Sequence, residues 1–273
     1  MNKIKVLHIL SSKTYNGAEN VVCQINSMLQ GTEDNIELIY CSLDGPVRSH
    51  IEENGIRFIP VSKIAKKEIA RVIREVKPDI IHAHDMRAGF VAALACGKIP
   101  LVSHIHNNNF DSRGLSLKSV LYLYAAIKAK HIFWVSKSSF DGYRFHNLLK
   151  NKSEILFNVI DVKALYKKAE LDTKTYNYDA VYLGRLTYQK NPQRLVEVLS
   201  EAVKKTPGFT AAILGDCEDA EEVKKLIRNN NIQNNVSYLG FSDNPYKILQ
   251  TAKLMILTSR WEGTPMCALE AIA

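Results

Sequence analysis

The chain has 273 residues, of which 46% are hydrophobic, so it can bury a sizeable core and is long enough for two globular domains. No run approaches the roughly 18 apolar residues of a membrane span, and the apolar run in MNKIKVLHIL is too short for a secretion signal. The net charge is +8, and the surplus lies early, since residues 1–160 hold 21 Lys/Arg against 14 Asp/Glu. This balance favours an anionic partner, such as a membrane surface, a phosphorylated substrate or nucleic acid, or else serves only solubility.

Short aliphatic runs alternate with amphipathic stretches along the first 160 residues. Strands are predicted at 5–10, 36–43, 57–61, 79–84, 100–106, 132–136 and 154–158. Helices are predicted at 17–30, 63–76, 86–96, 115–129 and 138–149. This alternation predicts βαβ units around a parallel sheet, and the continuously apolar strands indicate that both faces of the sheet are covered.

The stretch 161–179 is polar and weakly periodic, which predicts a link between domains. The alternation then restarts, with strands at 180–185, 210–215, 236–240 and 253–259 and with helices at 191–205, 219–230, 245–251 and the end of the chain. We therefore expect two doubly wound α/β domains, residues 1–160 and 161–273. The second domain has about four strands where such a unit normally has five or six, which predicts that it is incomplete.

Two pairs of histidines close neighbouring predicted strands. His82 and His84 end the strand in PDIIHAHD, and His104 and His106 end the strand in LVSHIHNNN. A spacing of two residues puts both members of a pair on one face of a strand. Four imidazoles near one sheet edge indicate acid–base chemistry or a metal, but no further residue stands at ligand spacing. A packed or solvent-facing role is the simpler alternative for each histidine.

Three further residues follow predicted strands, at the edge where open α/β sheets bind ligands. Gly17 opens a helix and allows close approach of the backbone to an anion, although the dinucleotide fingerprint G-x-G-x-x-G is absent. Arg185 and Lys190 lie in YLGRLTYQKNP, where two cations suit a diphosphate without a metal. No Asp-x-Asp that could hold Mg²⁺ occurs in the sequence. The alternatives are a turn glycine and two solvated cations.

The last stretch, WEGTPMCALEAIA, brackets a predicted helix start with two glutamates. Thr264 is expected to cap the helix and Pro265 to be its first residue, because these are favoured positions for Thr and Pro. Glu262 then precedes the helix, and Glu270 lies about one and a half turns into it. The free amides at the helix start, those of Met266 and Cys267, favour a phosphate. An anion site between two carboxylates suits a nucleotide sugar, and a capped surface helix is the alternative.

These motifs, in this order, resemble the retaining glycosyltransferases of family 4. The resemblance rests on the two glutamates with seven residues between them, on Gly184-Arg185-Leu186 with Lys190, and on NGAE, PDIIH, His106, VSKSS and NVID. It implies an α/β fold of the GT-B architecture, with two tandem Rossmann-like domains facing a cleft. Residues 1–160 would form the acceptor side and residues 161–273 would bind the nucleotide sugar.

The resemblance also implies roles for single residues. Arg185 and Lys190 would bind the donor diphosphate, together with Gly17 and the segment Thr264, Pro265, Met266 and Cys267. Glu270 would hold the ribose, whereas Glu262 and His106 would act at the transferred sugar. No metal and no other cofactor is expected.

The sequence departs from the family pattern at three places. Val159 stands where the family usually has Gly, and Asn16 stands where a second Gly is common. The chain also ends at Ala273, where family members usually continue, which predicts a C-terminally truncated chain whose own activity is open.

The resemblance predicts transfer of a sugar, expected to come from a UDP-sugar, to a glycan or lipid-linked acceptor in the synthesis of a surface polysaccharide. Alternatives are an isomerase of the nucleotide-sugar 2-epimerase kind, or an inactive truncated binding subunit. Nucleic-acid binding is suggested only by the sequence pI of about 9.1 and is not expected, since no recognisable module is present. Five scattered cysteines without a C-x-x-C pair favour a reducing, cytoplasmic location.

A basic stripe is predicted on the helix at 63–76. Its members, spaced by three or four residues, are Lys63, Lys66, Lys67, Arg71 and Arg74. The stripe suggests that the first domain rests on anionic lipid at the inner face of the cell membrane and meets a lipid-linked acceptor there. A solvated helix face is the alternative.

Overall fold

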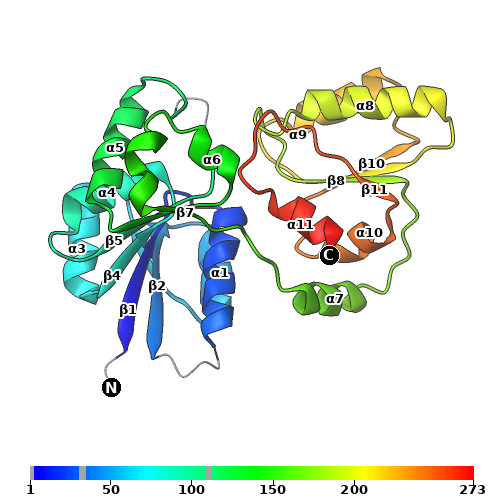
Figure 1. The fold of residues 1–273 in the computed structure, drawn as a ribbon. Helices are drawn as coiled ribbons and strands as arrows, with labels where there is room; N and C mark the ends of the chain where they lie inside the picture. Colours follow the sequence, from blue (N-terminus) through cyan, green and yellow to red (C-terminus); the bar gives the residue numbers. More distant parts are fainter. Residues whose placement is uncertain (1–2, 31–34, 108–111) are drawn as a thin grey trace. The chain divides into compact units, whose positions relative to one another are not determined.

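The computed structural model describes residues 3–30, 35–107 and 112–273. The chain folds into two compact units, Met1–Val159 and Ile160–Ala273, and residues make most of their contacts within their own unit. Each unit is an α/β domain built on a parallel sheet (Figure 1).

The first unit holds a seven-stranded sheet in the order β3-β2-β1-β4-β5-β6-β7, with every neighbouring pair parallel. Its strands are β1 (Ile4–Ile9), β2 (Ile36–Leu43), β3 (Arg57–Val61), β4 (Ile80–Ala83), β5 (Leu101–Ile105), β6 (His131–Trp134) and β7 (Ser153–Ile155). The order runs outward in both directions from β1 and β4, which is the arrangement of a doubly wound fold.

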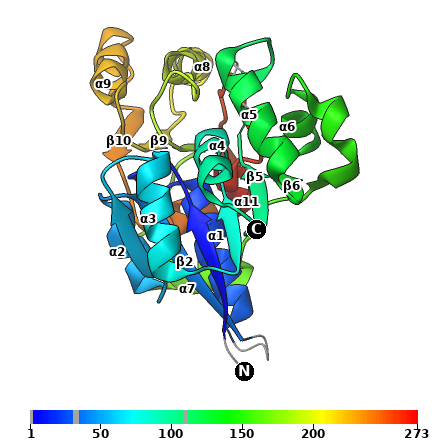
Figure 2. The ribbon, with the colours of Figure 1, turned by 90° about the vertical axis from the view of Figure 1, so that its left-hand side faces the viewer.

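Helices cover the two faces of this sheet (Figures 1 and 2). The larger core lies under α3 (Lys66–Val76), α4 (Met86–Ala95) and α5 (Leu117–Lys128). A smaller core on the opposite face lies under α1 (Gly17–Leu29) and α2 (Val47–Glu53). Two short elements follow β6, namely α6 (Lys137–Asp141) and the 3₁₀ helix η2 (His146–Lys152). The prediction of one helix over 138–149 is therefore wrong, because the chain turns at Gly142 between these elements.

The second unit holds a four-stranded parallel sheet in the order β10-β9-β8-β11. Its strands are β8 (Ala180–Leu183), β9 (Ala211–Leu214), β10 (Val236–Gly240) and β11 (Leu254–Met255). The larger core of this unit lies under α8 (Pro192–Lys205) and α9 (Ala220–Asn229), and the smaller core lies under α10 (Tyr246–Thr251) on the other face. The last helix is α11 (Met266–Ile272).

The segment predicted as a polar link contains a helix, α7 (Val162–Leu171). Asp161 starts it by accepting a hydrogen bond from the amide of Ala164. Contacts to α10 then hold the helix, and the Lys168 ammonium lies 5.7 Å from the centre of the Tyr246 ring. The sequence did not indicate this helix because its hydrophobic periodicity is weak. Only one of its residues, Ala169, is buried.

None of the helices in the described parts of the chain is both long and apolar enough to cross a bilayer. All five cysteines are free thiols, so no disulfide contributes to the stability of either unit.

Candidate donor site and histidine cluster

The second unit has its topological switch point between β8 and β11. From β8 the sheet grows through β9 to β10, whereas β11 lies on its other side. The loops that leave β8 and β11 therefore start side by side at one edge of the sheet. Ligands of open α/β sheets bind at such a point, beyond the carboxyl ends of the strands.

Hydrogen bonds join the two loops closely. The backbone amide of Arg260 donates to Gln189 O over 2.8 Å, and the Gln189 side chain returns a bond to Trp261 O over 3.0 Å. The Arg260 guanidinium donates to Asn191 Oδ1 over 2.9 Å and lies 4.4 Å from the centre of the Tyr188 ring. Since backbone and side chains both take part, the two loops form one framework that fixes the residues on it.

Lys190 and Glu262 meet within this framework. Lys190 Nζ lies 2.6 Å from Glu262 Oε1, and their side chains are only 12% and 22% exposed. The Ser259 hydroxyl donates to the same carboxylate oxygen over 2.5 Å. Removal from bulk water strengthens such a pair, because less solvent screens the two charges. The sequence placed these residues in separate motifs, and the structure brings them together.

Arg185 follows β8 and presents an exposed side chain. Its guanidinium has no hydrogen bond or ion pair to any residue that the structure describes, so it is a cation with free donors at the sheet edge. Gly215 follows the neighbouring strand β9. A side chain there is excluded, since a Cβ atom on Gly215 would lie 1.9 Å from Gly184 O. The backbones of the loops after β8 and β9 thus lie so close together at Gly215 that a residue with a side chain would not fit there.

The start of the last helix differs from the prediction for Thr264 and Pro265. Helix α11 begins at Met266, and Pro265 precedes it with ψ at 115°, which is an extended conformation. Pro265 is therefore the N-cap residue and not the first helical residue, and it makes no side-chain cap hydrogen bond of its own. The reason is that Pro265 O accepts the first helical bonds, from the amides of Ala268 and Leu269.

Met266 and Cys267 supply the first two amides of α11, as predicted. The helix has seven residues, so its dipole is small and an anion would interact mainly with these individual amides. The Cys267 side chain is buried, and burial raises the pKa of its thiol. This thiol is therefore a packing group and not a nucleophile.

Glu270 lies one turn further along α11 and is half-buried. Burial raises the pKa of its carboxyl group above the ordinary value, and the nearby Lys168 ammonium opposes this shift. A carboxylate that is partly removed from water can accept hydrogen bonds from a ligand at a lower desolvation cost than an exposed one.

The histidines of the first unit form a larger cluster than predicted. The pairs at spacing two do share a face, since the rings of His82 and His84 are 4.1 Å apart between centres, as are those of His104 and His106. His8 of β1 joins them, 5.0 Å from the His82 ring centre. A single histidine in a strand carries no signal in the sequence, and only the neighbouring position of β1 and β4 reveals this fifth member.

A chain of hydrogen bonds runs through three members of the cluster. His8 Nδ1 lies 2.8 Å from His84 Nε2, and His84 Nδ1 lies 3.0 Å from His106 Nε2. Both ring nitrogens of His84 are thus engaged, and the direction of each bond decides which nitrogen of His106 carries its proton. Burial, and after it the charge of His104, lowers the pKa of His106 well below the ordinary value, so this ring is neutral at pH 7.

Two groups of three histidines could hold a metal ion. The ring nitrogens of His8, His82 and His84 lie within 4.8 Å of one another, and so do those of His84, His104 and His106. Neutral imidazole nitrogens are ligands for zinc and similar ions, although the hydrogen bonds within the cluster already use several of them. The absence of a metal requirement stays a prediction.

The switch point of the first unit lies between β1 and β4, and Gly17 opens α1 in the segment that follows β1. Asp85, which follows β4, ties the two loops together. Its carboxylate accepts hydrogen bonds from the amide and hydroxyl of Ser11 and caps α4 through the amide of Ala88, over 2.7 to 3.0 Å. The sequence reasoning missed Asp85, which lies directly beside His84.

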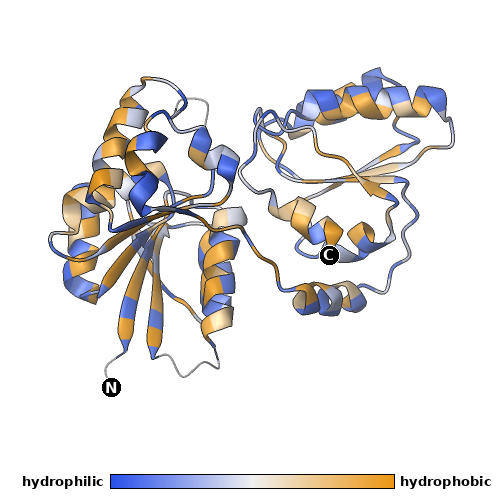
Figure 3. Ribbon diagram, viewed as in Figure 1, coloured by the Kyte–Doolittle hydropathy of each residue, from blue (hydrophilic) through white to orange (hydrophobic). Residues whose placement is uncertain are grey.

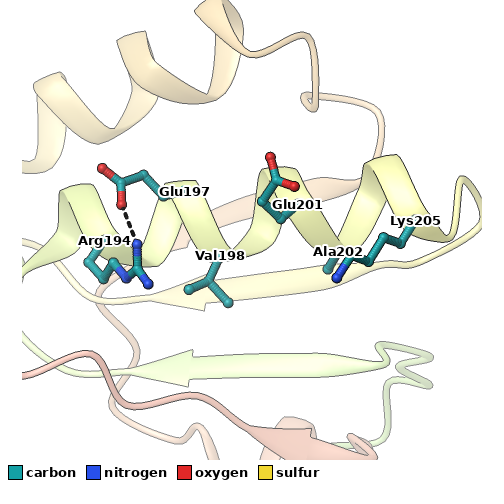
Figure 4. A pocket seen from close by; sticks show the side chains of 6 residues that line it. All are labelled: Arg194, Glu197, Val198, Glu201, Ala202 and Lys205. Carbon is teal, nitrogen blue, oxygen red and sulfur yellow. Dashed lines mark hydrogen bonds and ion pairs between the residues drawn. The ribbon is translucent and has the colours of Figure 1, made fainter.

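A shallow depression lies on the outer face of α8 and has no comparable chemistry. It runs along a single helix, and an ion pair of 2.9 Å closes one end of it (Figure 4). The residues around it are Arg194, Glu197, Val198, Glu201, Ala202 and Lys205. We assign no site to this solvated helix face.

The two parallel sheets, each with a switch point, thus define a protein of two Rossmann-like domains, the architecture called GT-B. The family model for Glycosyltransferase Family 4 matches residues 15–164, and the model for Glycosyl transferases group 1 matches residues 163–273. The chain therefore belongs to the family 4 glycosyltransferases.

Curated relatives extend this assignment. An uncharacterised glycosyltransferase of Methanocaldococcus jannaschii is 30% identical over 77% of this chain. The UDP-Gal:alpha-D-GlcNAc-diphosphoundecaprenol alpha-1,3-galactosyltransferase of Escherichia coli is 25% identical over 99% of this chain. The match spans 58% of the length of the first relative and 77% of the second.

Solved structures share the fold. HepE of Anabaena in complex with UDP and glucose superposes with a TM-score of 0.82 at 20% sequence identity, over 98% of this chain and 78% of HepE. The apo form of the lipopolysaccharide outer core galactosyltransferase WaaB superposes with a TM-score of 0.68 at 20% identity, over 98% of this chain and 78% of WaaB.

Proposed function

We propose that this protein is a retaining glycosyltransferase that moves a sugar from a UDP-sugar to a glycan or lipid-linked saccharide, in the synthesis of a surface polysaccharide. The observation that carries the proposal is the contact of Lys190 with Glu262 at the switch point of the second unit, where the guanidinium of Arg185, unpaired among the described residues, belongs to the same loop after β8. Cations for a diphosphate and a carboxylate for sugar hydroxyls lie side by side there, as a nucleotide sugar requires.

Donor binding follows from the charges at this edge. Arg185 offers unengaged N–H donors, and Lys190 can turn part of its hydrogen bonding from Glu262 to a phosphate oxygen. The amides of Met266 and Cys267 add two neutral donors, the bend at Thr264 and Pro265 sets their direction, and Gly17 allows close approach of the backbone. Glu270 would accept hydrogen bonds from the ribose hydroxyls. Since two cations balance the diphosphate charge, we propose that no metal is needed.

Glu262 and His106 are proposed to act on the transferred sugar. Glu262 accepts hydrogen bonds from sugar hydroxyls, and Lys190 and Ser259 hold its carboxylate in place. His106 contributes a neutral ring whose orientation the bond to His84 fixes. Both groups would contribute by positioning the sugar for attack by the acceptor on the face that the nucleotide leaves.

The acceptor class rests on the relatives. The Escherichia coli relative carries an undecaprenol diphosphate acceptor in its name, and a relative from Bacillus subtilis is named a poly(glycerol-phosphate) alpha-glucosyltransferase. We extend this to an acceptor on a lipid or polymer carrier, met by the protein in the cytoplasm at the inner face of the membrane. Five free cysteines fit a reducing compartment.

Calorimetric titration with UDP, GDP and their sugars tests the proposal. We expect UDP to bind, EDTA to leave its affinity unchanged, and Arg185→Ala to weaken it by about 10- to 100-fold, the loss of a charge-assisted contact of roughly 1.5–3 kcal/mol. Arg194→Ala on the outer face of α8 is the matched control and should bind as the parent chain does. Loss of UDP binding in EDTA, or equal affinity in the parent and Arg185→Ala, contradicts the proposal.

A further inference from the structure

Helix α5 presents an apolar stripe to solvent. Its exposed large side chains are Leu117, Val120, Leu121, Tyr124 and Ile127, and Leu117 and Ile127 are 74% and 63% exposed. At about 100° per residue these positions fall within roughly a third of the helix circumference. Most of α5 is accordingly orange in Figure 3. Single exposed apolar residues are ordinary in proteins, but a continuous stripe marks an interaction surface.

The opposite side of α5 is well anchored. Tyr122, Ala125 and Ala126 are buried in the main core of the first unit. Ser116 caps the helix start by accepting a hydrogen bond from the amide of Ser119. At the other end, Lys152 Nζ donates to the carbonyl groups of residues 126, 127 and 129. The stripe is therefore a rigid, outward face of a folded helix and not a loose segment.

The basic surplus of the first unit lies in the stretch of sequence that contains this helix. Residues 112–152 hold eight Lys/Arg and one Asp/Glu, whereas the rest of residues 1–160 holds 13 of each. By helical position Lys128 falls within the stripe, with its ammonium donating to Ala93 O over 2.8 Å, whereas Lys118 lies beside the stripe and Lys130 just past the helix. Apolar side chains flanked by cations are the composition of a helix that lies in the interface of an anionic bilayer.

Helix α3, where the sequence suggested a membrane contact, fits this role less well. Lys63 lies before the helix, and Arg71 forms ion pairs of 3.3 Å with both Glu68 and Glu75. Among the large apolar side chains of the described residues, none that is exposed lies between positions 29 and 114. The face of α3 is thus partly neutralised and has nothing to insert into a lipid layer.

We propose that the outward face of α5 docks the protein on an anionic lipid bilayer, with the apolar stripe in the headgroup region and the cations against lipid phosphates. This proposal rests on the proposed function, because docking on lipid would bring the protein to its lipid-linked acceptor. A second copy of the chain is the other partner that could cover an apolar stripe. Two-fold pairing through α5 would bring its basic surplus against itself, which disfavours that occupant.

Co-flotation of the full chain with phosphatidylcholine vesicles, with or without phosphatidylglycerol, tests the docking surface without donor or acceptor. We expect flotation that needs phosphatidylglycerol and falls at high salt. Lys118→Gln with Lys130→Gln should weaken it by about fivefold per cation removed. The matched control is Lys66→Gln with Lys67→Gln on α3, which removes the same charge from exposed sites and should leave flotation unchanged.

The apolar stripe is tested in the same assay by Leu117→Gln, with Leu171→Gln on α7 as the matched control at a similarly exposed position. Circular dichroism melts establish that all variants are folded. Loss of flotation in Leu117→Gln alone supports the proposal. No flotation of the parent at low salt, equal loss in the α3 control, or self-association that Leu117→Gln abolishes would each overturn it. UDP affinity, measured separately, reports on the transferase proposal alone.

Discussion

Lys190 and Glu262 form a nearly buried ion pair, although 72 residues separate them in the chain. Each follows a strand on one side of the switch point of the second unit. Without a ligand, Glu262 therefore neutralises a cation that a diphosphate would need. In the proposed donor site, a bound nucleotide sugar would share Lys190 with this carboxylate, so the pair would link the proposed phosphate and sugar contacts.

The energetic coupling of this pair is the first prediction. Lys190→Ala leaves the Glu262 carboxylate partly buried without its cation, and we expect a loss of about 1.5–3 kcal/mol in the free energy of unfolding. Lys190→Ala with Glu262→Ala should recover part of this loss, because no unpaired charge remains. Urea unfolding of the parent, both single variants and the double variant measures the coupling. Strictly additive losses would show that the contact contributes nothing in solution.

The two glutamates of the last motif should have separable effects. Glu270→Ala removes the proposed ribose acceptor, so the affinity for UDP itself should fall. Glu262→Ala should leave UDP affinity nearly intact, since Lys190 stays available for the diphosphate, and should lower turnover of the UDP-sugar. Calorimetry with UDP and a transfer assay distinguish the two effects, with Glu222→Ala on the exposed side of α9 as the control. The opposite pattern would exchange the two assigned roles.

His84 is expected to act on catalysis through His106. Its ring is held 3.0 Å from His106 and 2.8 Å from His8, so His84→Phe keeps a ring in the stack but removes both hydrogen bonds. A misplaced His106 should lower kcat by about 10- to 100-fold. The KM for the donor should change little, because the cations and helix amides proposed to bind its diphosphate come from the second unit.

The matching control is His82→Phe, which changes a stacked ring that has no hydrogen bond to His106 among the described residues. The pH profile of kcat separates positioning from a merely structural role, since only loss of the bond to His84 changes the environment of the His106 proton. Equal kcat values and equal pH profiles for the two variants would remove His84 from the mechanism.

Most of the architecture could be predicted because apolar runs and strands coincide. The ranges predicted for β2, β3 and β10 agree with the structure, since each is a short run rich in aliphatic and aromatic residues. The run at 253–259 predicts a longer strand than β11, which ends at Met255. Beyond Ile256 the chain leaves the sheet, and Thr258 bonds instead to the carbonyl groups of Lys190 and Asn191.

The contacts that make the site were not accessible from the sequence. Strand order decides that His8 joins His82 and His84, and that Asp85 reaches Ser11, and strand order is not encoded locally. Likewise, the sequence-based prediction assigned Lys190 to a phosphate and Glu262 to a sugar, with no contact between the two residues. The ion pair between them depends on β8 and β11 being neighbours across the switch point.

The buried histidines should make the first unit sensitive to acid. Burial, and after it the charge of His104, lowers the pKa of His8 from 6.5 to about 3. Burial lowers that of His104 from 6.5 to about 4. Below pH 6.5 the unfolded chain binds protons that the folded chain does not, so the free energy of unfolding falls as pH decreases towards these folded values. The contribution is fully present above pH 6.5, and its loss is at most about 1.4 kcal/mol per pH unit for each histidine.

Urea unfolding between pH 7.5 and pH 4.5 measures this slope. His104→Gln should reduce the slope by about 1 kcal/mol per pH unit between pH 6 and pH 4.5, because its side chain does not titrate there. His146→Gln lies outside the cluster and is the matched control. A slope that His104→Gln leaves unchanged would mean that the imidazole of His104 takes up its proton equally in the folded and unfolded chain, and that the cluster is open to water in solution.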